Sequence, residues 1–141
     1  MYASYASPSS GAKAYARLGL ETSVMNASQL QLMLMLFEGA GTAIRMARHH
    51  MAQGEIAAKG NAISKAINIV DSGLKAALDA DASDPAACEL VANLSALYDY
   101  ISGRLLHANR HNDPALLDEA ERLLENIGSA WREIDGNNMP G

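Results

Sequence analysis

Histidines are the side chains in this sequence whose spacing comes closest to a chemical site. His49 and His50 are adjacent, and His107 and His111 are four residues apart, which places two imidazoles on one face of a helix. Such a pair can hold a transition metal, so a metal-binding or catalytic helical bundle that uses His107 and His111 is one interpretation. The C-terminal end of a helix, however, also favours histidine through the helix dipole and its exposed carbonyls. We therefore expect no resident metal and no other cofactor.

The remaining residues give little support to an enzyme. The sequence has no glycine-rich phosphate loop and no pair of Glu-x-x-His motifs of the kind that builds a di-iron bundle. Its one cysteine, Cys88, has no base nearby in the sequence and is expected to be a small buried or half-buried hydrophobe. A lone cysteine also excludes an internal disulfide and favours a reducing compartment. The chain is predicted not to be an enzyme.

Apolar residues in excess of what a bundle core requires indicate a binding site. In the helix expected over 28–54, Met35, Gly39, Thr42 and Met46 form a stripe about 100–160° away from the core stripe. Methionines separated by small residues can accept a partner helix, because methionine adapts to varied surfaces. Two alternatives stay open: the wide stripe belongs to a compact bundle, or it mediates self-association.

The next helix carries a similar set of small residues beside its core face. Ala58, Ala62, Ile69 and Ala76 would let another backbone approach closely. Ala62 and Ile69 are therefore candidate contacts for the same partner. The alternative is again that these residues are part of a compact bundle.

The segment 93–109 separates two tyrosines that are close in sequence. On a helix, Tyr98 shares a face with the apolar residues of this segment, whereas Tyr100 lies about 200° away, on the polar side with Arg104. We expect Tyr98 in the core. Tyr100 is expected on the surface, held near Arg104 or available to a partner.

Four amphipathic segments position these residues and predict an all-α fold. The helices are expected over 28–54, with Ser28 as N-cap, over 55–78, over 85–111 and from the N-cap Asp113 to about 135. Short connections make neighbouring helices antiparallel, so residues 21–135 should form an antiparallel up-down four-helix bundle. The expected core residues are Met33, Leu36, Phe37, Ala40, Ile44, Ala47, Met51, Ile63, Ile67, Val70, Leu74, Ala77, Leu94, Leu97, Tyr98, Ile101, Leu105, Ala108, Leu116, Ala120, Leu123, Leu124, Ile127, Trp131 and Ile134.

The two ends of the chain are expected to be less regular. Residues 1–20 should form a flexible N-terminal arm with a short helix, since a Ser/Pro/Gly-rich stretch precedes two helical turns that end at Gly19. Tyr15 and Leu18 of this arm could pack on the bundle as a small, displaceable apolar plug. Residues 136–141 are expected to form a frayed tail.

Composition narrows the range of partners. The chain has 141 residues, 49% of them hydrophobic but only 5% aromatic, and it contains no apolar run long enough to cross a membrane. Residues 1–80 hold seven Lys/Arg and five Asp/Glu, against four and eleven in residues 81–141, and no helix carries a basic stripe. We expect neither nucleic-acid nor membrane binding, and a cytoplasmic location.

Several motifs resemble those of the flagellar secretion chaperone family. Lys13-Ala-Tyr15 looks like the N-terminal tyrosine motif of the family, and residues 26–40 look like its first-helix signature, with Gln29 in place of the usual proline. Leu97-Tyr-Asp-Tyr-Ile101, followed by Arg104-Leu105 and Ala108-Asn109, resembles the third-helix signature, and Trp131 the late tryptophan. The likeness covers nearly the whole chain.

This resemblance implies a function as well as a fold. It implies an antiparallel helical bundle that binds the disordered C-terminal segment of flagellin in the cytosol. Binding would prevent premature polymerisation and deliver the subunit to the flagellar type III export apparatus. The export apparatus and flagellar regulators are candidate further partners.

Overall fold

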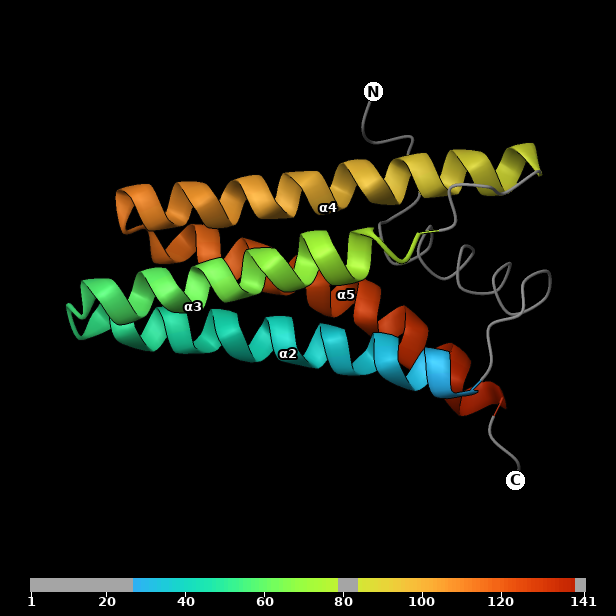
Figure 1. The fold of residues 1–141 in the computed structure, drawn as a ribbon, viewed down its shortest axis with the longest axis horizontal. Helices are drawn as coiled ribbons and strands as arrows, with labels where there is room; N and C mark the ends of the chain where they lie inside the picture. The colour runs from blue at the N-terminus through green and yellow to red at the C-terminus, as the bar shows by residue number, and fades with distance from the viewer. Residues whose placement is uncertain (1–26, 79–83, 139–141) are drawn as a thin grey trace.

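Over the residues that the computed structural model describes, 27–78 and 84–138, the chain is built from helices without strands (Figure 1). These are α2 (Ala27–Ala52), α3 (Ile56–Asn68), the π-helical segment η2 (Ile69–Lys75), α4 (Pro85–His111) and α5 (Pro114–Asn138). The predicted all-α class is confirmed. The expected arm 1–20, with Tyr15 and Leu18, lies outside the described residues.

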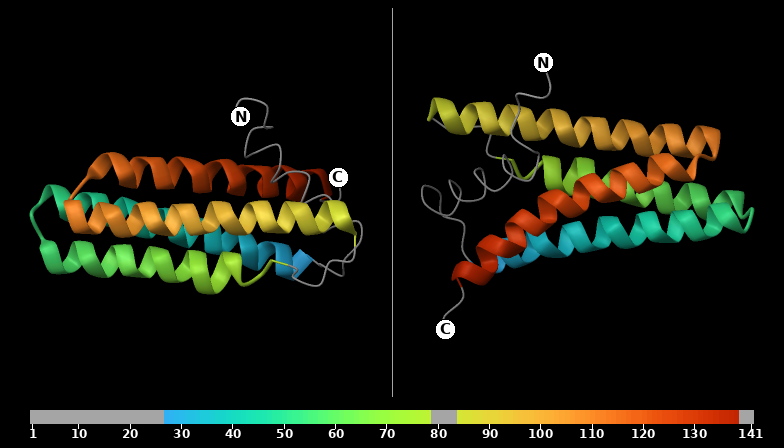
Figure 2. Two further views of the ribbon diagram at one scale, coloured as in Figure 1. Left: turned by 90° about the horizontal axis from the view of Figure 1, so that it is seen from above. Right: turned by 180° about the vertical axis from the view of Figure 1, so that it is seen from behind.

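With α3 and η2 taken together as one helix, consecutive helices run in opposite directions and form the four edges of a bundle. α2 packs against α3–η2 and against α5, and α4 packs against the same two neighbours (Figure 2). The α2–α3 and α4–α5 turns lie at the same end of the molecule (Figure 1). The antiparallel up-down four-helix bundle is therefore confirmed. In this arrangement α2 and α4 are diagonal, so the α2–α3 seam and the α4–α5 seam lie on opposite sides.

The core follows the predicted stripes. Tyr98 and Trp131 are buried, and each large apolar side chain withdrawn from water stabilises the fold by about 1.5–3 kcal/mol. The largest fully buried side chains are Trp131, Ile44, Ile63, Leu74, Ile101, Leu105, Leu117, Ile127 and Val70. The expected core residues Leu36, Met51, Ile67, Leu97 and Leu123 are only partly buried but pack against this core. The side chain of Ile134 is not among those described.

Three predicted helix ends are wrong by a few residues. The helix expected to run to residue 54 already ends at Ala52. Ser28 is the second residue of α2 rather than its N-cap, because Leu30 is already buried in the core and packing extends the helix past the capping signal. At the other end, α5 runs to Asn138 and so includes residues 136–138 of the expected tail.

The helix expected over 55–78 differs more strongly from the prediction. Its second half is π-helical, and regular structure ends at Lys75, so Ala77 lies beyond the helix and is exposed rather than in the core. Within η2, a Cβ on Gly73 would meet Cδ2 of Leu36 at 3.2 Å, which shows how closely η2 approaches α2. A π-helical turn inside a helix is frequently found at functional sites.

Helix caps fix the remaining turns. Asp84 accepts a hydrogen bond from the backbone N–H of Ala86, with Pro85 in the first turn of α4, as predicted. Asp113 accepts one from the backbone N–H of Ala115 over 3.0 Å and so begins α5 as predicted. Between the two helices, Asn112 ends α4 in the left-handed conformation with φ 51°.

None of the described helices combines the length and the apolarity that a membrane span requires.

Candidate functional site

The outward stripe of α2 exposes large apolar side chains to solvent. Met35 is 64% exposed and Met46 is 51% exposed, while Gly39 between them is half-buried. Leu32, 57% exposed, lies on the same stripe because it precedes Gly39 by seven residues, close to two helical turns. Sequence analysis did not single out Leu32, although the same spacing would have found it.

Residues of α3–η2 line the other side of this stripe. Ile69 lies directly against Gly39: a Cβ on the glycine would stand 3.5 Å from its Cδ1. Ala62, seven residues before Ile69, is level with Met46 because α2 and α3 are antiparallel. Ala62 and Ile69 are both half-buried. The predicted contacts on α2 and on α3–η2 therefore lie along one line.

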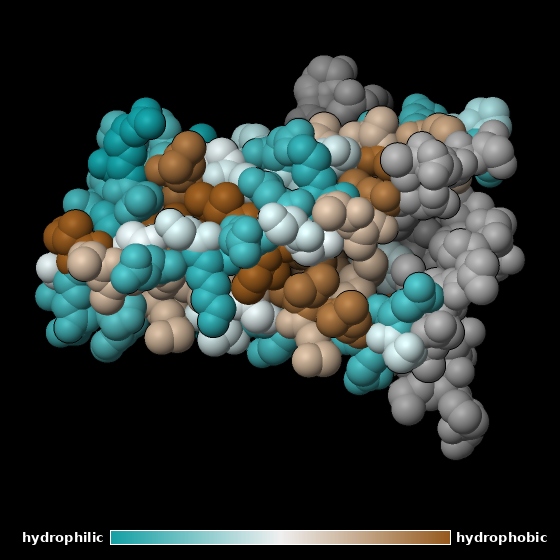
Figure 3. Space-filling model, in the orientation of Figure 1, coloured by the Kyte–Doolittle hydropathy of each residue, from teal (hydrophilic) through white to brown (hydrophobic). Residues whose placement is uncertain are grey.

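We call this line the apolar seam and define it by six residues: Leu32, Met35, Gly39, Met46, Ala62 and Ile69. Apolar side chains gather along it between α2 and α3–η2 in the space-filling view (Figure 3). Between residues 32–48 of α2 and residues 58–75, the structure describes no side-chain hydrogen bond or ion pair. The seam is thus held together by packing alone.

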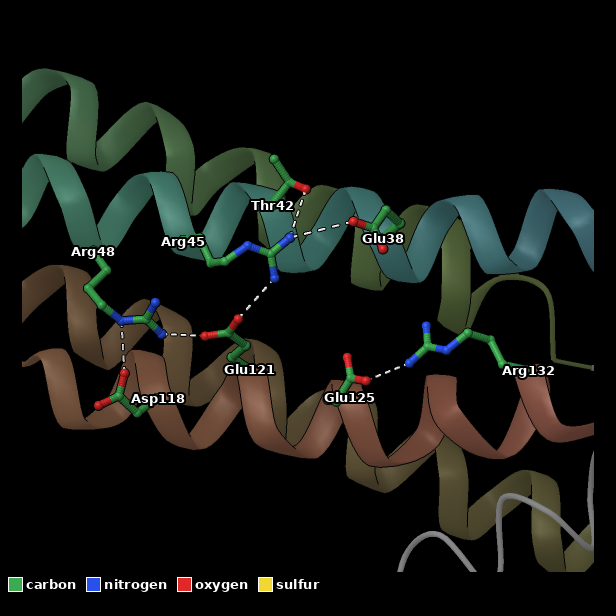
Figure 4. Close-up of polar contacts among 8 residues, drawn as sticks. All are labelled: Glu38, Thr42, Arg45, Arg48, Asp118, Glu121, Glu125 and Arg132. Atoms are coloured by element: carbon green, nitrogen blue, oxygen red, sulfur yellow. Dashed lines mark hydrogen bonds and ion pairs between the residues drawn. The ribbon is translucent and has the colours of Figure 1, made fainter.

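The seam between α2 and α5 is closed by charges instead (Figure 4). Arg45 donates from Nη1 to Glu121 over 3.0 Å, and Arg48 donates from Nε to Asp118 over 2.8 Å and from Nη2 to Glu121. Burial alone would raise the pKa of the Glu121 carboxyl, but the hydrogen bonds from Arg48 and Arg45 outweigh it and the pKa lies below its ordinary value. Thr42 is tied to this network, since its hydroxyl oxygen accepts a bond from Arg45.

Polar contacts also bridge the seam between α3–η2 and α4. Lys75 pairs with Asp99 over 2.6 Å, and the hydroxyl of Ser102 donates to Asp71 over 2.7 Å. Near the α4–α5 turn, the buried Lys59 donates to the backbone carbonyl of Asn109 over 2.9 Å. These polar contacts fix the geometry of the interface between α3–η2 and α4.

Tyr100 and Arg104 lie on the α4–α5 seam, away from the apolar seam. The hydroxyl of Tyr100 donates to Glu119 over 2.6 Å, Arg104 donates from Nε to the same carboxylate over 2.9 Å, and the guanidinium lies 5.4 Å from the centre of the tyrosine ring. The bond from Tyr100, followed by that from Arg104, holds the pKa of Glu119 below its ordinary value against the effect of burial. Tyr100 is 45% exposed, so its ring is available but fixed in orientation.

The histidines form two pairs at one end of the bundle. The rings of His107 and His111 lie with centroids 4.2 Å apart, as their spacing predicts. His49 and His50 approach Glu55, a residue that sequence analysis did not connect with them. Cys88 is exposed, which corrects the expectation that it is buried or half-buried, because it lies on the outer face of the first turns of α4.

Comparison with known proteins assigns the chain to a family. Residues 11–138 match the family model described as flagellar protein FliS. The chain belongs to the FliS family. This confirms the resemblance drawn from the sequence motifs.

Three relatives support the family over most of their length. The flagellar secretion chaperone FliS of Salmonella typhimurium is 51% identical over 125 residues, which is 89% of this chain and 90% of the relative. That of Escherichia coli is 46% identical over 123 residues, covering 87% and 88%. That of Bacillus subtilis is 32% identical over 113 residues, or 80% of each chain. As a FliS family member, the protein is a chaperone of flagellar export.

The motifs that resemble the FliS family divide between core and surface. Of the third-helix signature, Tyr98, Ile101 and Leu105 are buried, whereas Tyr100 and Arg104 project toward Glu119 and solvent. Trp131 is buried as well. The signature therefore serves both the core and the surface, where Asp99 and Tyr100 are exposed and Arg104 is half-buried.

Proposed function

We propose that this FliS family member binds the disordered C-terminal segment of flagellin in the cytosol, keeps it from polymerising early and delivers it to the flagellar type III export apparatus. The observation that carries the proposal is the apolar seam. The seam exposes Leu32, Met35 and Met46 beside the half-buried residues Gly39, Ala62 and Ile69. No described polar side-chain contact joins residues 32–48 of α2 to residues 58–75 across it. The protein acts by binding, without a catalytic step.

The seam suits an amphipathic helix that folds as it binds. Gly39 and Ala62 let the ligand backbone come close, and the flexible methionines adjust to its side chains. Fully burying a side chain such as Met35 contributes about 1.5–3 kcal/mol, while ordering a disordered segment costs about 2–5 kcal/mol or more. Several apolar anchors along the seam are therefore needed for stable binding.

Tyr100 and Arg104 offer a second contact on the opposite side of the bundle. A disordered chain can wrap a large surface, so one flagellin segment can reach both the apolar seam and the α4–α5 seam. The ring of Tyr100 is held in place by Glu119 and is ready to stack against a ligand without losing further rotamer freedom. Wrapping of this kind would cover the segment that flagellin uses for assembly.

The N-terminal arm supplies two further proposed contacts, Tyr15 and Leu18. If residues 1–18 act as a displaceable plug, deleting them strengthens or accelerates ligand binding, since the ligand no longer has to expel the arm. If Tyr15 contacts the ligand directly, the same deletion weakens binding. Calorimetry with the full chain and the truncated chain separates the two roles.

The direct test mixes the purified protein with a peptide of the flagellin C-terminal segment. The expected result is a gain in far-ultraviolet helical signal beyond the sum of the two components, with calorimetric binding in the micromolar range or tighter. No heat and no gain in helicity would overturn the proposal. Size exclusion at several concentrations, with and without flagellin, tests the alternative that the Met35/Met46 stripe serves self-association.

A further inference from the structure

The turn between α2 and α3 folds a carboxylate back onto the histidines that end α2. Gly54 adopts φ +72°, a left-handed conformation that glycine takes without strain. The backbone N–H of Glu55 then donates to the carbonyl of His50 over 2.9 Å, and that of Gly54 to the carbonyl of Met51 over 3.2 Å. This pattern is a Schellman motif, and it places Glu55 beside the last turn of α2.

Three potential metal ligands meet as a result. Nδ1 of His50 lies 2.7 Å from Oε1 of Glu55, and the rings of His49 and His50 have centroids 5.4 Å apart. One ligand atom from each of the three residues lies within 4.8 Å of the others, the one such group of three among the described residues. All three side chains are at least partly accessible to an ion from solvent.

We propose that His49, His50 and Glu55 bind one divalent transition-metal ion, with Zn²⁺ as the best-suited common ion. Two imidazole nitrogens and one carboxylate oxygen are ligands that Zn²⁺ takes at about 2.0–2.2 Å, with water in the remaining position. Two such ligands on a tetrahedral ion are about 3.3 Å apart. His50 and Glu55 thus have to separate by roughly half an ångström, and His49 has to move closer by a side-chain rotation.

The histidine pair singled out by the sequence is a poorer site. His107 and His111 stack with their ring centroids 4.2 Å apart, and no carboxylate joins them in a group of three ligands within the described residues. Two ligands leave an ion more weakly held than three. The pair therefore provides a matched control on the same end of the bundle.

An ion at this position would link the last turn of α2 to the residue just before α3. It would stabilise the α2–α3 hairpin increasingly as the free metal concentration rises above the dissociation constant, because it binds the folded turn more tightly than the unfolded chain. The inference is independent of flagellin binding, since it concerns the end of the bundle and not the apolar seam.

The test uses the full-length protein without a histidine tag and titrates ZnCl₂ in a calorimeter at neutral pH. The expected result is one ion per chain. Affinity should fall at least tenfold in each of His49→Ala, His50→Ala and Glu55→Gln, and stay unchanged in the His107→Ala/His111→Ala double variant. The thermal midpoint should rise with Zn²⁺ in the parent protein and not in His50→Ala.

Three results would overturn the proposal. The first is the absence of Zn²⁺ binding to the parent protein. The second is an affinity that the three single variants leave unchanged, and the third is an affinity that the His107→Ala/His111→Ala variant abolishes. Circular dichroism of each variant without metal checks that the bundle is folded, so that a lost ion is not mistaken for a lost fold.

Discussion

Gly39 of α2 and Ile69 of η2 approach each other so closely that a Cβ on the glycine would stand 3.5 Å from Cδ1 of the isoleucine. That distance is an ordinary van der Waals contact, so the glycine is not required by the packing of the folded chain. Because Gly39 has no side chain, it leaves space in the apolar seam for the backbone of a ligand. Folding and ligand binding therefore place opposite demands on this position.

Gly39→Ala should raise the free energy of unfolding by about 0.5–1 kcal/mol, because alanine favours the helix and the new methyl group has room. The same methyl group raises the floor of the seam, so the affinity for a flagellin C-terminal peptide should fall severalfold. Urea denaturation and calorimetry measure the two effects.

Gly60→Ala is the matched control for this substitution. Gly60 lies within α3, where a Cβ would meet Oδ1 of Asn109 at 3.9 Å, on the seam with α4. It should stabilise the helix by a similar amount and leave peptide affinity unchanged. Equal affinity of the Gly39→Ala protein and the parent protein would show that no ligand backbone passes over Gly39.

Lys59→Met should lower the free energy of unfolding by about 2 kcal/mol. The buried ammonium of Lys59 donates to the carbonyl of Asn109 and to the side chain of Asn112, and hydrogen bonds to a charged group contribute about 1.5–3 kcal/mol. Lys65→Met, on the exposed face of the same helix, should change stability by less than about 0.5 kcal/mol. Equal effects of the two substitutions would mean that Lys59 does not hold the α4–α5 turn.

Glu121→Gln should reduce stability at pH 7 by about 1 kcal/mol, and the difference from the parent protein should disappear in acid. The pKa of Glu121 is lower in the folded chain than its ordinary value of 4.5. Its contribution is therefore complete above pH 4.5 and is lost as the pH falls through the folded pKa. Denaturation measured from pH 7 to pH 3 follows the loss.

The control for this pH dependence is Glu125→Gln. Glu125 pairs with Arg132 of the same helix and is well exposed, so its removal should have little effect at any pH. A stability gap for Glu121→Gln that stays constant down to pH 3 would argue against the folded-state pKa shift.

Tyr100→Ala should leave the bundle folded and weaken peptide binding, because the ring is partly exposed and lies outside the core. Tyr100→Phe keeps the ring but loses the hydrogen bond to Glu119. If the ring face contacts the ligand, the phenylalanine variant should bind nearly as well as the parent protein. Parent-like binding by Tyr100→Ala would remove the α4–α5 seam from the proposed site.

Much of the architecture follows from local pattern. Helical periodicity predicted that Tyr98 is buried and Tyr100 is exposed, and caps such as Asp113 predicted where helices begin. The π-helical segment was not predictable in this way. Within this segment Gly73 lies close to Leu36 of another helix, and periodicity within one helix carries no information on such a contact.

In the candidate sites, too, the sequence predicted which residues share a helix face but not their partners on other helices. A helical wheel places Tyr100 beside Arg104, yet their shared partner Glu119 is 19 residues from Tyr100 and on another helix. Arg45 and Glu121, 76 residues apart, meet only because α2 and α5 pack with one particular rotation. Such partners depend on the relative rotation of packed helices, which the sequence pattern of a single helix does not determine.

The central claim is that the apolar seam binds the flagellin C-terminal segment, and a calorimetric titration of that peptide into two variants tests it most directly. Met35→Ser/Met46→Ser removes two exposed anchors of the seam, and Leu106→Ser removes an equally exposed apolar side chain from α4. Each substitution should change stability by less than about 0.5 kcal/mol. The account predicts at least tenfold weaker binding for the double variant and unchanged binding for Leu106→Ser. Parent-like affinity of Met35→Ser/Met46→Ser would contradict it.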